Sequence, residues 1–167
     1  AGDVGVGDEG GLVAAPSSRA PVGSRPFLDP ATFFSGGGGL VSTAMDYLRF
    51  CQMLLNGGEL DGVRLLSPTT VEIMTRNHLP REMGEYAPGL GFGLDFSLVL
   101  DPVEAGTVSK GEYFWGGAAG TWFWIDPMED LVFVGMIQQF GAQRPDVRSL
   151  SRQLVYQAIT ESTALGG

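Results

Sequence analysis

Cysteine and histidine are nearly absent from this sequence, with one of each in 167 residues. Cys51 alone cannot form an internal disulfide, and it lies in an apolar helical pattern, where a buried and inert thiol is the usual case. Because His78 is the only histidine, neither a zinc site of His and Cys ligands nor a Cys–His catalytic pair is expected. We expect a surface or capping role for His78, and we predict no metal and no other cofactor.

Positive charge is scarce as well, since ten Lys and Arg stand against 19 Asp and Glu, for a formal net charge of −9. The basic residues are scattered, whereas binding to a phosphate backbone needs clustered cations. We therefore expect no nucleic acid and no anionic membrane surface as a partner. Apolar runs such as 131–137 are far too short to cross a bilayer, so no membrane span is expected.

Glycine and proline are abundant in one place, because the first 40 residues hold ten of the 26 glycines and four of the ten prolines. Such a segment cannot form a long helix, so we interpret residues 1–35 as a Gly/Pro-rich connector with one short strand at 11–15. A lead-in of this length is unusual in a compact domain. We expect that an upstream segment packs against it.

A helix, a hairpin and a second helix are predicted after the connector. Ser42 or Thr43 caps the first helix, and the Asn-Gly-Gly run at 56–58 ends it, because glycine adopts the left-handed conformation that a helix C-cap requires. An Asp-Gly pair in the middle of residues 59–66 predicts a tight hairpin. The Ser-Pro pair at 67–68 then opens the second helix as its cap and first residue.

Three antiparallel strands are predicted next, at 91–100, at 112–115 running into 121–125, and at 131–137. A helix at 147–161 follows, and its apolar stripe is expected to dock on one face of the sheet. This stripe consists of Val147, Leu150, Leu154 and Ala158. The predicted fold class is α+β: an antiparallel sheet, a C-terminal helix packed on one face of it, and the helix–hairpin–helix segment.

Two other clusters of residues invite a functional interpretation but favour a structural one. The four glycines at 36–39 lack the Lys-Ser/Thr of a phosphate loop, so we expect a bend or close backbone packing there. Asp126, Glu129 and Asp130 crowd one turn without the glycine and ligand spacing of an EF-hand. They are predicted to begin and end strands rather than to bind Ca²⁺.

The run 115–121, Trp-Gly-Gly-Ala-Ala-Gly-Thr, has almost no side chains between two strand-like stretches. Glycine weakens a strand interior unless it serves a bulge or lets a ligand or another backbone approach. Two interpretations stay open: a kinked strand in which Trp115, Trp122 and Trp124 are packing residues, or the rim of a cleft.

Three segments taken together, at 34–47, 54–68 and 115–127, resemble the superfamily of serine β-lactamases and penicillin-binding proteins. The likeness extends from about residue 30 to residue 160, and it is strongest to class C β-lactamase-related proteins and family VIII carboxylesterases. The resemblance implies that residues 36–167 are the C-terminal portion of a β-lactamase-like serine hydrolase domain.

In that family the active site has a Ser-x-x-Lys element with the nucleophile, a Tyr-x-Asn or Ser-x-Asn element, and a Lys-Thr-Gly strand. Trp115-Gly116-Gly117 stands at the third element and is similar to the triplet of the carboxylesterases, so ester hydrolysis is favoured over penicillin hydrolysis. The resemblance implies that Trp115, Gly116 and Gly117 contact the substrate. It also implies that the backbone N–H of Ala118 is a donor of the oxyanion hole.

The first two elements are missing from this sequence: no serine has a lysine three places on, and no tyrosine has an asparagine two places on. We therefore expect a C-terminal piece that is inactive alone, with the nucleophile and base in the N-terminal catalytic part of a longer parent protein. The parent is expected to act on a small ester or amide. The piece is expected to dimerise or aggregate through an apolar face left exposed.

Two alternatives from other classes stay open. The parent could be a non-catalytic binding module that kept the fold and lost the chemistry, as the departure from Lys-Thr-Gly suggests. The chain could also be a purely structural subdomain that packs against its partner half. Upstream sequence separates the first alternative from an enzyme, because only an enzyme needs Ser-x-x-Lys and Tyr-x-Asn.

Overall fold

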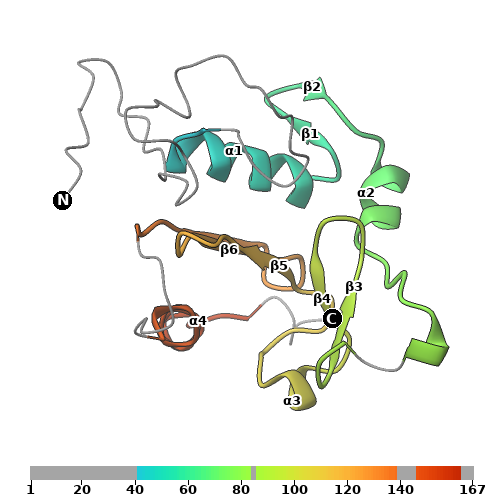
Figure 1. Cartoon of the computed structure of the whole chain (residues 1–167). Coiled ribbons are helices and arrows are strands. Elements are labelled where there is room, and N and C mark those ends of the chain that lie inside the picture. Colours follow the sequence, from blue (N-terminus) through green and yellow to red (C-terminus); the bar gives the residue numbers. More distant parts are fainter. Residues whose placement is uncertain (1–40, 84–85, 139–145, 163–167) are drawn as a thin grey trace, which may run out of the picture.

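The structure is a computed structural model that describes residues 41–83, 86–138 and 146–162 (Figure 1). The predicted connector at 1–35, its short strand, and the glycine run at 36–39 lie outside the described residues. The elements in chain order are α1 (Ala44–Leu55), β1 (Glu59–Leu60), β2 (Val63–Arg64), α2 (Pro68–Met74), the 3₁₀ turn η1 (Arg81–Met83), β3 (Leu90–Phe92), β4 (Ser97–Val99), α3 (Pro102–Ala105), β5 (Tyr113–Gly116), β6 (Trp122–Asp126), β7 (Leu131–Gly135) and α4 (Val147–Gln157).

Of the two sheets in the described part of the chain, the larger is antiparallel and lies between two helices. Its strands follow the order β3-β4-β5-β6-β7, so each strand pairs with its neighbour along the chain. Helix α1 covers one face of this sheet, and α4 lies on the other face (Figure 1). The predicted α+β class, with a C-terminal helix on one face of an antiparallel sheet, is confirmed.

The helix–hairpin–helix segment forms as its local signals predict. Thr43 caps α1, since its hydroxyl accepts a hydrogen bond from the Asp46 N–H at 3.1 Å. Asp61 and Gly62 have φ angles of 53° and 76°, the left-handed pair that a two-residue hairpin between β1 and β2 requires. Ser67 caps α2 by accepting from the Thr70 N–H at 3.0 Å.

The main core lies between α1 and the sheet. Cys51, Met53 and Leu54 of α1 are buried there, with Leu98, Tyr113, Phe123 and Ile125 from the strands. Burial raises the pKa of the Cys51 thiol to about 12, so the thiol stays protonated at neutral pH. The predicted burial of Cys51 is therefore confirmed.

The single strand predicted at 91–100 is wrong, because this segment is a hairpin of β3 and β4. Phe92 pairs with Ser97, and the Gly93 N–H donates to the Phe96 carbonyl at 2.8 Å to close the turn. Asp95 has a φ of 74°. The alternation of apolar residues hides this turn, because Leu94 at its tip continues the pattern although its side chain is exposed.

The strand predicted to run from 112 through 125 is also wrong, because it is a second hairpin. β5 and β6 pair antiparallel, with Gly116 opposite Trp122, so the glycine-rich run is the loop between them rather than a kink within one strand. The sheet therefore has five strands where three are predicted. The turn between β6 and β7 is confirmed: the Asp126 carboxylate accepts from the backbone N–H groups of Met128 and Glu129.

The prediction that an apolar stripe docks helix α4 on the sheet is wrong. Leu150 and Leu154 are 53% and 56% exposed, and the helix ends at Gln157 rather than near 161. The side of α4 that meets the sheet is polar: Ser151 and Tyr156 bond to residues of β6, and Arg152 bonds to Glu112 just before β5. Hydrophobic periodicity identifies the stripe but not its partner, and here hydrogen bonds and an ion pair decide the orientation.

Candidate functional site

The loop between β5 and β6 is closed by two backbone hydrogen bonds. The Gly117 N–H donates to the Thr121 carbonyl at 2.7 Å, and the Gly120 N–H donates to the Gly117 carbonyl at 3.1 Å. Gly120 has a φ of 97°, a conformation that side chains rarely adopt, so glycine is needed there. The loop thus presents Ala118 and Ala119 at its tip, and Ala118 is exposed.

The end of β5 next to this loop has an open edge. β4 pairs with β5 only at Tyr113 and Phe114, and within the described residues no strand pairs with the same side of Trp115 and Gly116. The Trp115 side chain is 44% exposed and meets the ring of Phe92 edge-to-face, with centroids 5.2 Å apart. A strand end of this kind offers free backbone groups to an extended ligand.

A cavity of about 270 Å³ lies beside this end of β5 and is lined by residues of β5, β6 and α4 together with Tyr86. Its lining consists mainly of aromatic side chains, joined by Gly116 and by two arginines of α4, Arg148 and Arg152. Of the four predicted site residues, Trp115 and Gly116 line the cavity, and Gly117 and Ala118 follow directly in the loop. The glycine-rich run is therefore not sealed in the interior.

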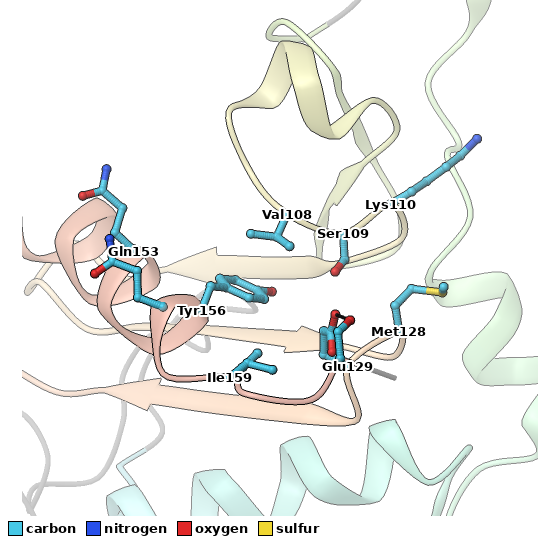
Figure 2. A pocket seen from close by; sticks show the side chains of 10 residues that line it. Val108, Ser109, Lys110, Met128, Glu129, Gln153, Tyr156 and Ile159 are labelled. Carbon is cyan, nitrogen blue, oxygen red and sulfur yellow. Dashed lines mark hydrogen bonds between the residues drawn. The ribbon is translucent and has the colours of Figure 1, made fainter. Parts of the chain in front are cut away.

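A larger cavity of about 600 Å³ lies at the other end of β6, and none of the predicted site residues lines it. Figure 2 shows Tyr156 and Ile159 facing Val108 and Ser109 across it, with Glu129 at one side. The larger volume alone does not make it the better candidate for chemistry.

Arg148, near the start of α4, is a residue of the site that sequence reasoning missed. Its Nη2 donates to the carbonyls of both Gly117 and Thr121, each at 3.1 Å. Its guanidinium lies against Gly116, where an ideal Cβ would be only 2.4 Å from Nη1. The sequence contains one signal for this role. A positive charge in the first turn of a helix is unfavourable against the helix dipole, so an arginine there suggests that its side chain binds a group outside the helix.

Behind the β5–β6 hairpin lies a network of buried charges. Glu112 is fully buried and forms an ion pair with Arg152 at 2.6 Å, while the Arg152 guanidinium lies 5.0 Å from the ring centroid of Phe114. The Tyr156 hydroxyl lies 2.9 Å from Glu112 Oε2 and 2.6 Å from Asp126 Oδ2. This network joins α4 to β6 and to the residue just before β5.

Burial governs the titration of this network. It raises the pKa of Glu112, against the opposing effect of Arg152, and the nearby Asp126 raises it further. Burial also raises the pKa of Tyr156, to which the negative charge of Glu112 adds. Both groups therefore keep their protons to a higher pH than exposed Glu and Tyr side chains do.

Other candidate groups have structural roles. The His78 ring lies 2.8 Å from the Ile73 carbonyl, and its backbone N–H donates to the Phe92 carbonyl, which agrees with a capping role. Across the described ranges, no three His, Cys, Asp or Glu side chains are grouped to hold a metal ion. The helices of the described segments are also too short or too polar to cross a membrane.

Comparison with known proteins places these features in one family. The model of the family described as Beta-lactamase matches residues 5–157. Two curated proteins of Mycobacterium tuberculosis, "Uncharacterized protein MT1414" of strain CDC 1551 / Oshkosh and "Protein Rv1367c" of strain H37Rv, are each 44% identical over 131 residues. The match covers 72% of this chain and 33% of each relative, so the chain spans about a third of their length.

A solved structure supports the same assignment. "EstCE1, a hydrolase with promiscuous acyltransferase activity" is 28% identical, with a TM-score of 0.57, over 74% of this chain and 32% of that one. The family match over most of the sequence and this shared fold agree with the hairpin, helix and sheet arrangement described above. The chain belongs to the Beta-lactamase family.

Proposed function

We propose that residues 36–167 are the C-terminal part of a serine acyl hydrolase whose nucleophile and base lie in an upstream part of the parent protein. A serine of that upstream part attacks an ester or amide carbonyl, and the Ala118 N–H helps to hold the oxyanion that forms. A donor aimed at developing charge lowers the barrier by about 3 kcal/mol.

The observation that carries this proposal is the open end of β5 beside a cavity. Trp115 and Gly116 line that cavity, and the loop that follows exposes Ala118. Trp115 is then a wall of the acyl pocket, while Gly116 and Gly117 let the substrate approach the backbone closely. These are the positions at which the family has its third active-site element.

Ester substrates are favoured over β-lactams. The lysine and threonine that would hold a β-lactam carboxylate are replaced by Trp115 and Gly116, which offer neither charge nor hydroxyl. The name of EstCE1, a hydrolase with acyltransferase activity, supports acyl transfer at this fold. A small ester with an apolar acyl group suits the aromatic walls of the cavity.

The test compares the isolated chain with the parent protein, using p-nitrophenyl acetate and p-nitrophenyl butyrate as substrates. We expect turnover by the parent and none by the 167-residue chain, because the chain has no Ser-x-x-Lys. Replacing the parent's Ser-x-x-Lys serine by alanine is the matched control and is expected to abolish turnover.

Two outcomes would contradict the proposal. Serine-dependent turnover by the isolated chain would show that the nucleophile lies within these residues. A parent that lacks Ser-x-x-Lys and Tyr-x-Asn and hydrolyses neither ester would instead be a binding module that has kept the fold.

A further inference from the structure

The loop of the proposed oxyanion hole is held from outside, by a residue of helix α4. The carbonyls of Gly117 and Thr121 close the loop by accepting from backbone N–H groups within it. Arg148 Nη2 donates to the same two carbonyls, each at 3.1 Å. One nitrogen therefore bridges the two ends of the loop, from a residue 27 to 31 positions away in the sequence.

Fixing the Gly117 carbonyl also fixes the Ala118 N–H. The two groups belong to one planar peptide unit, and the described residues contain no cis peptide bond, so the N–H points opposite to the carbonyl. The Gly117 carbonyl is directed at Arg148. The Ala118 N–H is consequently directed away from Arg148, and its direction depends on where the guanidinium lies.

Gly116 makes room for this arrangement. An ideal Cβ at Gly116 would lie 2.4 Å from Arg148 Nη1 and 2.6 Å from Cζ, well inside contact distance. The middle residue of the family triplet Lys-Thr-Gly has a side chain, and in this chain the guanidinium occupies that space. The absence of a side chain at Gly116 is therefore what lets Arg148 lie against the loop.

We propose that Arg148 is a positioning residue that sets the direction of the Ala118 N–H by clamping the Gly117 and Thr121 carbonyls. This inference rests on the proposed function for its catalytic consequence, because the Ala118 donor matters only if an oxyanion forms beside it. The clamp itself does not depend on that function. Arg148 acts through the backbone and need not touch the substrate.

The clamp can be tested in the parent protein with three substitutions. Arg148→Met keeps the apolar stem and removes the donors, Arg148→Lys keeps a charged donor without the planar fork, and Gly116→Ala places a methyl group where the guanidinium lies. Arg76→Met is the matched control, because it removes an exposed arginine that pairs with Glu72 far along the chain from the loop.

Hydrogen exchange measured by mass spectrometry on the peptide covering 115–122 reports on the clamp. Loss of one hydrogen bond of about 1.4 kcal/mol corresponds to roughly tenfold faster exchange. We expect this increase for Arg148→Met and Gly116→Ala, a smaller one for Arg148→Lys, and none for Arg76→Met. Unchanged exchange in Arg148→Met would overturn the inference.

Ester hydrolysis reports on the positioning role. In Arg148→Met we expect kcat to fall about tenfold with KM within about twofold, because an oxyanion donor acts in the transition state and not on bound substrate. Arg148→Lys should recover part of kcat. The Gly116→Ala/Arg148→Met double variant should resemble the single variants, because both act through the same guanidinium.

Two results in an active parent would overturn the inference: an unchanged kcat in Arg148→Met despite faster exchange, or a rise in KM with kcat unchanged. A wild-type parent without any hydrolysis would contradict the proposed function instead. In that case the exchange measurement would still decide whether Arg148 clamps the loop.

Discussion

The Tyr156 hydroxyl lies between two buried carboxylates, Glu112 and Asp126, but it has a single proton to donate. Tyr156 can form a hydrogen bond with each carboxyl group only if one of the two is itself protonated and donates to the tyrosine oxygen. Burial raises the pKa of Glu112, so this carboxyl takes up a proton at a higher pH than an exposed glutamate does. The ion pair with Arg152 opposes this rise, because the guanidinium favours the charged carboxylate of Glu112.

The raised pKa of Glu112 makes a prediction about pH. In the folded chain its pKa lies above the ordinary value of 4.5, so the folded state holds the proton more tightly than the unfolded state. Its contribution to stability is complete below about pH 4.5 and is lost as the pH rises through the folded-state pKa. The facing groups are Arg152 and Tyr156 of α4 and Asp126 of β6.

Urea unfolding at a series of pH values from 4 to 8 tests this prediction against Glu112→Gln, which cannot titrate. The free energy of unfolding of the wild-type chain should decline relative to the variant as the pH rises. A difference between the two proteins that stays constant with pH would show that Glu112 does not titrate in the folded state.

At the scale of single elements, the junction between α1 and the β1–β2 hairpin is tightly constrained. The Gly58 N–H donates to the Met53 carbonyl at 2.8 Å, and the Gly58 carbonyl accepts from Leu65 and Leu66. Its φ is 97°, and an ideal Cβ would lie 2.2 Å from the Leu66 carbonyl oxygen. Gly62 in the hairpin has a φ of 76° but nothing within 4 Å.

These two glycines form a matched pair for mutagenesis. Gly62→Ala should cost about 1 kcal/mol, since only the left-handed backbone opposes it. Gly58→Ala should cost about 2 kcal/mol more, because the added methyl group would overlap the backbone of Leu66, which cannot move aside as a side chain could. Urea unfolding at equal protein concentration gives both values. Equal costs would mean that the junction relaxes freely.

Local signals predicted the parts of the fold that depend on a few neighbouring residues. Thr43, Ser67 and the Asp61-Gly62 pair act within three or four positions of themselves, so caps and the first hairpin were predictable. The turn at 93–96 was not predictable, because Leu94 continues the apolar alternation of the strand into the turn. A strand pattern shows which residues are apolar but not where the chain reverses.

The candidate site was predictable only in part, for the same reason. The glycine-rich run and its neighbour Trp115 are visible in the sequence, and they do lie beside a cavity. Arg148 meets the run from 27 to 31 positions away, through hydrogen bonds that no periodicity encodes. The polar side of α4 was missed likewise, because helical periodicity detects only the stripe of Leu150 and Leu154.

At the scale of the whole molecule, that stripe is an exposed apolar surface. Leu150 and Leu154 stand on the side of α4 away from its bonds to the sheet. The chain spans about a third of its curated relatives, so in a longer protein other residues are available to cover this surface. We expect the isolated chain to associate through it.

Light scattering over a dilution series tests this expectation. The wild-type chain should form dimers or larger species whose mass falls on dilution, and the Leu150→Glu/Leu154→Glu variant should shift the equilibrium toward monomer. Val103→Glu is the control, because Val103 is 90% exposed on α3 and should not affect association. A wild-type monomer at every concentration would contradict the expectation.

The order of strands in the sheet has a consequence for how the chain finds its fold. Because each strand from β4 to β7 hydrogen-bonds to the one before it in sequence, none of the five described strands must pass between two that are already joined. Every hairpin can close on its own short stretch, and the loop entropy lost at each step is small. The strand pairs can therefore form early, whereas the packing of α1 against β7 joins segments that are distant in the sequence and is expected to form more slowly.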